Sequence, residues 1–163
     1  MKNISESYRY ERKFIIPYHN KFSINHLIKT SNLRFLEQYN SRKVNSIYLD
    51  TPNLRFYQDN INGLSKRFKF RIRWYGEEEI INEPFLEIKS KNNDLGEKKI
   101  ISIKKFVFNE SATSLKEIKN SLLEISKSKL FNYKLSQLVP TLFISYSRKY
   151  FISRMINCRL TID

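Results

Sequence analysis

The sequence predicts an α+β domain whose antiparallel sheet curls into a barrel or tunnel, with helical insertions. Several segments alternate polar and apolar residues with a period of two, which is typical of half-buried strands. A stretch with helical spacing, near residues 115–125, interrupts this series of strands. Strands, then a helical insertion, then strands again favour an antiparallel sheet, and closure of that sheet would hide its edges.

The first half of the chain contains strand patterns and two short helical patterns. "YRYERKFIIP" alternates and stops at Pro17, and the apolar residues at positions 24, 27 and 28 have helical spacing. "VNSIYLDTP" is the next strand, after which Thr51 is placed to cap a helical turn and Pro52 to open it. "KRFKFRIRWYG", residues 66–76, is the strand that follows.

The patterns in the second half of the sequence predict two strands before the helical insertion and two strands after it. "PFLEIKSK" and "EKKIISIKKFVF" are joined by "NNDLG", which resembles a hairpin turn. Apolar spacing from Leu115 to Ile125 predicts the helix, and Ser114 with Glu117 offers a capping box at its start. "LVPTLFISYSRKYFI" and "CRLTID" complete the series of strands.

The strand at residues 66–76 carries cations on one face only. Positions 67, 69, 71 and 73 are Lys or Arg, while Phe68, Phe70, Ile72 and Trp74 occupy the opposite face. Two interpretations are open. The charged face is a solvated surface, or it binds a polyanion that offsets the repulsion between its like charges.

Length and composition limit the class of protein. The 163 residues suffice for a single domain over residues 1–163, and the net charge of +14 favours an anionic partner. Cys158 is the only cysteine, which excludes an internal disulfide and a cysteine-based zinc cluster. No apolar run is long enough for a membrane span, and the first residues lack the apolar core of a signal peptide. We therefore expect a cytoplasmic protein, on its own or on a membrane face through partners.

Charged residues also share a face in other strands. Glu87 and Lys89 alternate with apolar residues in "FLEIKSK", as Glu11 and Lys13 do in "YERKFII". Arg148 lies among tyrosines in "ISYSRKYF", and Arg159 shares a face with the last residue of "CRLTID". If the sheet closes, these faces converge into one enclosed lining that suits phosphates.

Motifs along nearly the whole chain resemble those of the VTC domain, the polyphosphate polymerase branch of the triphosphate tunnel metalloenzymes. They are "ERKF", "SIYLDTPNLRFYQDNI", "FRIRWYG", "LEIKSK", "GEKK", "SYSRKYF" and "RLTID", in this order from about Tyr10 to Asp163. The resemblance implies an antiparallel eight-stranded tunnel with basic walls. It also implies transfer of the terminal phosphate of ATP, or another nucleoside triphosphate, to a polyphosphate chain, with Mn²⁺ or Mg²⁺ as cofactor.

The resemblance also implies a set of site residues. The residues expected to act in catalysis are Arg71, Arg73, Lys89 and Arg148. The same residues, with Lys13, Lys98 and Arg159, are expected to bind the phosphates of the substrate, because arginine forks and lysine point charges both suit phosphate oxygens. Glu11 and Glu87 are candidate metal ligands, and the alternative for each is an ion pair with Lys13 or Lys89.

A departure from the family pattern keeps other functions open. The pattern continues past "TID" with strands that carry a metal-binding glutamate, so we expect the tunnel to be C-terminally truncated in this chain. Such a chain would bind phosphate yet make little polymer by itself. The alternatives are a non-catalytic module that binds polyphosphate or nucleotide and a triphosphate hydrolase of the same superfamily. No nucleic-acid partner is expected, because the aromatic residues lie opposite the arginines and offer no stacking surface beside them.

Overall fold

The computed structural model describes residues 11–77, 80–108 and 135–163. The chain forms two compact units. The first comprises Met1–Gln38 with Phe151–Leu160, and the second comprises Tyr39–Tyr150 with Thr161–Asp163. The second unit contains the hydrophobic core and the cations discussed below.

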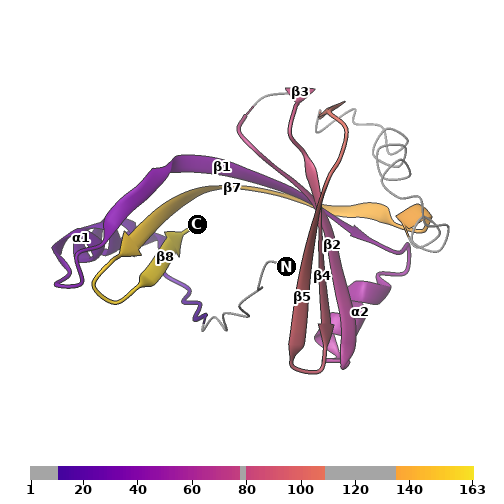
Figure 1. Cartoon of the computed structure of the whole chain (residues 1–163), viewed down its shortest axis with the longest axis horizontal. Helices are drawn as coiled ribbons and strands as arrows, with labels where there is room; N and C mark the ends of the chain where they lie inside the picture. Colours follow the sequence, from indigo (N-terminus) through magenta and orange to yellow (C-terminus); the bar gives the residue numbers. More distant parts are fainter. Residues whose placement is uncertain (1–10, 78–79, 109–134) are drawn as a thin grey trace, which may run out of the picture. The chain divides into compact units, whose positions relative to one another are not determined.

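Among the described residues, the helical elements are short and the strands dominate (Figure 1). The helices are η1 (Tyr18–Asn20), α1 (Lys21–Thr30) and α2 (Arg55–Ile61). The strands are β1 (Leu36–Asp50), β2 (Lys66–Tyr75), β3 (Ile80–Ile81), β4 (Phe85–Asn92), β5 (Leu95–Ser102), β6 (Phe106–Val107), β7 (Val139–Ser153) and β8 (Cys158–Ile162). One sheet has the order β5-β4-β2-β1-β7-β8, and β3 pairs with β6 in a small second sheet.

The main sheet is antiparallel, as the sequence predicts. β2 runs antiparallel to both β1 and β4, and β4 runs antiparallel to β5. β1 and β7 are also antiparallel. Thr141 donates a hydrogen bond to the carbonyl of Tyr48, and Ser145, which is later in β7, donates one to Asn45, which is earlier in β1. The fold is therefore α+β with a mostly antiparallel sheet.

The apolar face of β2 forms the centre of the core. Phe70, Ile72 and Trp74 are all buried, as the alternation of residues 66–76 predicts. The ring of Trp74 stacks on Phe143, with 6.0 Å between the ring centroids. The other buried members of this core are Ile47, Leu49, Ile81, Leu86, Ile88, Ile103, Phe106, Leu135 and Leu138.

A buried carboxylate starts α2, which lies beside β2 (Figure 1). Asp50, at the end of β1, accepts hydrogen bonds from the backbone N–H groups of Phe56 and Tyr57 at 2.9 and 2.8 Å. The hydroxyl of Thr51 accepts one from Arg55, but the N-cap position belongs to Leu54, so the predicted role of Thr51 as the cap is wrong. The predicted place of Pro52 as the first helical residue is wrong, because the helix begins only at Arg55.

The hairpin between β4 and β5 sets the register of two charged strands. Asn92 pairs with Leu95, which leaves a two-residue loop of Asn93 and Asp94. Asn93 has a positive φ of 54°, a conformation that asparagine tolerates in such loops. The predicted hairpin is confirmed, and its register places Lys98 directly opposite Lys89.

Two strand predictions need correction. Residues 11–17 form no strand, and Phe14 and Ile15 are exposed, because no neighbouring strand pairs with this segment in the described parts of the chain. The pattern "EKKIISIKKFVF" divides into β5 and β6. The backbone N–H of Ile103 still bonds to the carbonyl of Pro84 in the register of the β4–β5 pair, but proline has no N–H with which to continue the ladder. The predicted helix from Leu115 to Ile125, with its capping box, lies outside the described residues.

The first unit has its own small set of buried groups. Ile28 on α1 and Phe151 on β7 are buried, as is Ser153, whose hydroxyl donates to the carbonyl of Leu33. Ile28 faces inward as the helical spacing of this segment predicts.

Candidate anion-binding site

The register of β1, β2, β4 and β5 aligns charged side chains in rows across one face. One row runs from Tyr48 through Arg71 and Glu87 to Ile100. The neighbouring row consists of cations, with Lys69, Lys89 and Lys98 directly opposite one another. On the other side of the Glu87 row, Ser46 lies opposite Arg73.

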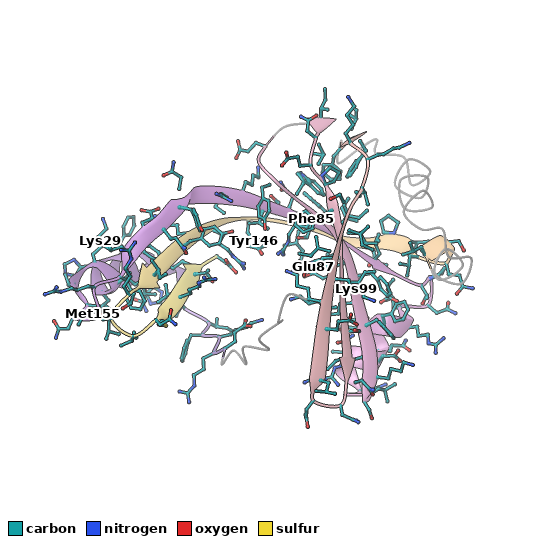
Figure 2. All side chains as sticks on the ribbon, in the orientation of Figure 1. Lys29, Phe85, Glu87, Lys99, Tyr146 and Met155 are labelled. Atoms are coloured by element: carbon teal, nitrogen blue, oxygen red, sulfur yellow. The ribbon has the colours of Figure 1, made fainter. Side chains whose placement is uncertain are left out.

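Glu87 is the centre of this arrangement (Figure 2). Its side chain is only 1% exposed, and cations from three strands contact its carboxylate. Arg71 on β2 donates a hydrogen bond to Oε1, and the Nζ of Lys89 on β4 lies 3.7 Å from the same oxygen. The Nζ of Lys98 on β5 lies 3.1 Å from Oε2. We call Arg71, Glu87, Lys89 and Lys98 the Glu87 cluster.

The cations of the Glu87 cluster differ in how much of each is exposed. The Arg71 side chain is 14% exposed, whereas those of Lys89 and Lys98 are 52% and 49% exposed. Arg71 also donates to the hydroxyl of Tyr48 at 3.1 Å, and its buried Nε has no partner among the described residues. The guanidinium is therefore held in place while both ammonium groups can meet a solvent-borne anion.

The pKa values in the Glu87 cluster reflect competition between burial and charge. Burial raises the pKa of Glu87, but the charges and hydrogen bonds of Arg71 and Lys98 outweigh it, so the pKa is lowered overall. Burial and the positive charge of Arg71 lower the pKa of Lys89, and the negative charge of Glu87 opposes that change. Glu87 is thus ionised at neutral pH.

A second group of arginines lies beside the Glu87 cluster. Arg73 is 7% exposed and donates from Nε to the Ser46 hydroxyl at 3.1 Å. The Nη2 of Arg73 donates to the hydroxyl of Tyr146 at 3.4 Å. The centroid of the Tyr146 ring lies 5.2 Å from the guanidinium carbon of Arg148. Arg148 in turn donates two hydrogen bonds to the carboxylate of Asp163. A tyrosine therefore links the two arginines on β2 and β7.

The structure brings most of the expected phosphate-binding residues into the second unit. Arg71, Lys89 and Lys98 meet at Glu87, while Arg73 and Arg148 meet at Tyr146. The expected residues of the first unit are Lys13, which is exposed and 3.5 Å from Glu11, and Arg159, which is exposed on β8. Whether all of these residues bind phosphate stays a prediction.

Partners from β1 were missed by reasoning from the sequence. Ser46 and Tyr48 orient Arg73 and Arg71, and their alternation in "VNSIYLD" already placed them on one face. The bond between Arg148 and Asp163 was also missed, because it depends on how β7 and β8 pair.

The described residues do not form a metal-ligand set. They contain no group of three or more His, Cys, Asp or Glu side chains placed to hold an ion. Both oxygens of Glu87 already face cations, and Glu11 is paired with Lys13. Both glutamates thus form ion pairs, whereas their predicted role as metal ligands stays a prediction, and we derive no step through a protein-bound metal.

Comparison of the sequence with known proteins places the chain in a family. The sequence profile described as the VTC domain matches residues 8–163. The chain belongs to the VTC-domain family. Among curated proteins, no match to this VTC domain was found. Within the parts of the chain that the structure describes, no helix is both long and apolar enough to cross a membrane.

Proposed function

We propose that this VTC domain is a polyphosphate polymerase-type domain that binds a nucleoside triphosphate and transfers its terminal phosphate to a polyphosphate chain. The observation that supports this proposal best is the Glu87 cluster, with Arg73 beside it on the same face of the sheet. Membership of the VTC-domain family agrees with it.

The chemistry of phosphoryl transfer suits such a cluster. During transfer, negative charge spreads over the oxygens of the γ-phosphoryl group, and fixed cations stabilise it without having to reorganise. Arg71 and Arg73 are mostly buried and hydrogen-bonded, so they are already oriented. Lys89 and Lys98 add point charges that are open to solvent.

The proposed step exchanges one P–O bond for another. A terminal oxygen of the polyphosphate chain attacks the γ-phosphorus, and the bond from that phosphorus to the β–γ bridging oxygen breaks. The chain gains one phosphate and the nucleoside diphosphate leaves. Mn²⁺ or Mg²⁺ would enter as the counter-ion of the nucleotide, since the described side chains offer no ligand set of their own. We place this reaction in the cytoplasm, where a lone cysteine stays reduced.

A non-catalytic module that binds polyphosphate is the second candidate. It is favoured by one observation, namely that the carboxylate in the centre of the site is engaged by cations rather than free. Incubation with γ-labelled ATP and Mn²⁺ separates the candidates, because labelled polymer on a gel indicates a polymerase. Free labelled phosphate indicates a hydrolase, and binding of tripolyphosphate without turnover indicates the binding module.

Two adjacent lysines of β5 test whether this face is the binding site. Lys98 contacts Glu87, whereas Lys99 lies on the opposite face and pairs with Glu97 at 3.5 Å. We expect Lys98→Met to weaken tripolyphosphate binding by about 1.5 kcal/mol, the lower end of the range for hydrogen bonds to charged groups. Lys99→Met removes the same charge and should leave the affinity within about twofold of wild type. Equal losses in a calorimetric titration would mean that this face does not bind the anion.

A further inference from the structure

We propose that Glu87 is a positioning residue: it gathers Arg71, Lys89 and Lys98 on one face and holds them there for phosphate binding. This inference rests on the proposed function, since it concerns the same site. Glu87 would repel a phosphate directly, and its side chain is 99% covered, so any role in binding is exerted through the cations that it contacts.

The first argument is the cost of the cluster without its carboxylate. Lys89 lies directly opposite Lys69 on β2 and Lys98 on β5. Like charges in opposite positions of neighbouring strands destabilise a sheet. The carboxylate of Glu87 lies within 4 Å of the charged groups of Arg71, Lys89 and Lys98, so it offsets part of this repulsion before any anion binds.

The second argument is a division of labour among the three cations. Arg71 is held at two points, by Glu87 and by the hydroxyl of Tyr48. Lys89 and Lys98 keep about half of their side-chain surface exposed, and each is a flexible chain with three donors. The lysines can therefore turn toward a phosphate while Arg71 and Glu87 stay paired beneath them.

The test compares two glutamate variants that remove the same charge. Glu87→Gln removes the central carboxylate, whereas Glu97→Gln removes an exposed one that pairs with Lys99 on the other face. Without ligand, NMR relaxation of isotope-labelled lysines at neutral pH should show the side chains of Lys89 and Lys98 becoming more mobile in Glu87→Gln, and not in Glu97→Gln, because the carboxylate that both ammonium groups contact is lost. Unchanged mobility of both lysines would overturn the inference, whatever the protein binds.

The second readout is the affinity for tripolyphosphate at neutral pH. Removing a negative charge beside the anion would by itself strengthen binding, so a loss of roughly tenfold in Glu87→Gln, with Glu97→Gln close to wild type, is the result expected of a positioning residue. Wild-type protein that binds no tripolyphosphate would instead refute the proposed function, and the mobility of the lysines would still decide the role of Glu87. An affinity of Glu87→Gln equal to or above that of Glu97→Gln would refute the positioning role alone.

Glu87→Asp covers the case in which Glu87→Gln does not fold. Aspartate keeps the negative charge but withdraws it by one methylene, so the affinity for tripolyphosphate should fall roughly fivefold, as expected for cations that are slightly displaced. Wild-type affinity would show that the placement of the carboxylate is irrelevant, and would overturn the proposal.

Discussion

At the scale of single residues, Arg71 and Glu87 are the pair on which the site depends. Both are largely covered, and each is the other's hydrogen-bond partner. A buried charge that loses its partner destabilises a protein far more than an intact pair stabilises it. We therefore expect Arg71 to matter for stability as well as for the proposed binding, in contrast to the half-exposed lysines around it.

We predict that Arg71→Ala lowers the free energy of unfolding by about 3 kcal/mol, because it leaves the Glu87 carboxylate buried with only the two lysines. Urea unfolding at neutral pH measures this change. The double variant Arg71→Met with Glu87→Leu should recover much of the loss, since apolar side chains of similar size need no charged partner. Unfolding of Arg71→Ala at the wild-type urea concentration would contradict the importance of this pair.

The second residue-scale prediction concerns acid. The folded-state pKa of Glu87 lies below its usual value of 4.5, so its ionised form contributes stability that is fully present above this pH. That contribution is lost as the pH falls through the lowered pKa. In thermal melts, the difference in Tm between wild type and Glu87→Gln should therefore be largest near neutral pH and shrink below about pH 4.

The matched control for the acid series is Glu97→Gln. Glu97 is exposed, and its ion pair in the described part of the chain is with the exposed Lys99, so its loss should leave the melting curve close to wild type across the pH range. A constant difference between wild type and Glu87→Gln down to pH 3 would show that packing, rather than charge, explains the effect of the substitution.

At the scale of elements, the site is a consequence of strand register. The two-residue loop at Asn93 and Asp94 makes β4 and β5 partners, and it sets Lys98 opposite Lys89. The apolar alternation of β2 fixes which face meets the core, and so which face its arginines occupy. A slip of one residue in either pair would place the cations on the wrong side of the sheet.

We predict that Asp50→Ala destabilises the domain by about 1–2 kcal/mol, since it removes the carboxylate that accepts the N–H groups of Phe56 and Tyr57 at the start of α2. α2 contributes the ring of Phe56, which packs against Phe68 and Phe70. Chemical unfolding measures the change. Glu77→Ala, at an exposed ion pair with Lys43, is the control and should stay within about 0.5 kcal/mol of wild type.

At the scale of the whole molecule, charge governs what the chain attracts. The net charge of +14 draws anions of any kind by long-range attraction, so affinity alone does not identify the ligand. Specific recognition requires cations that are already placed, as they are in the Glu87 cluster and around Arg73. The two contributions respond differently to salt and to the structure of the anion.

We predict that tripolyphosphate binds more tightly than AMP, and that its affinity falls as salt rises from about 50 to 300 mM, because screening weakens exposed charges such as those of Lys89 and Lys98. Calorimetric titrations of both ligands at each salt concentration measure this dependence. Equal affinities for AMP and tripolyphosphate would argue against a site built for a chain of phosphates.

The sequence alone determined the faces of the strands and the family. Alternation in "KRFKFRIRWYG" assigns the aromatic residues to the core and the cations to the other face, because successive side chains of an extended chain point to opposite sides. The turn residues of "NNDLG" specify a hairpin by local backbone preference. Both are local properties, which is why they could be predicted.

Only the tertiary structure decided which charges meet. Glu87 contacts Arg71 and Lys98 because β4 lies between β2 and β5 at one particular register, and that register results from packing across strands rather than from any single segment. The same reason explains the strand that was wrongly predicted at residues 11–17. An alternating segment becomes a strand only when another strand pairs with it through backbone hydrogen bonds. The pattern of the segment itself does not show whether such a strand lies beside it.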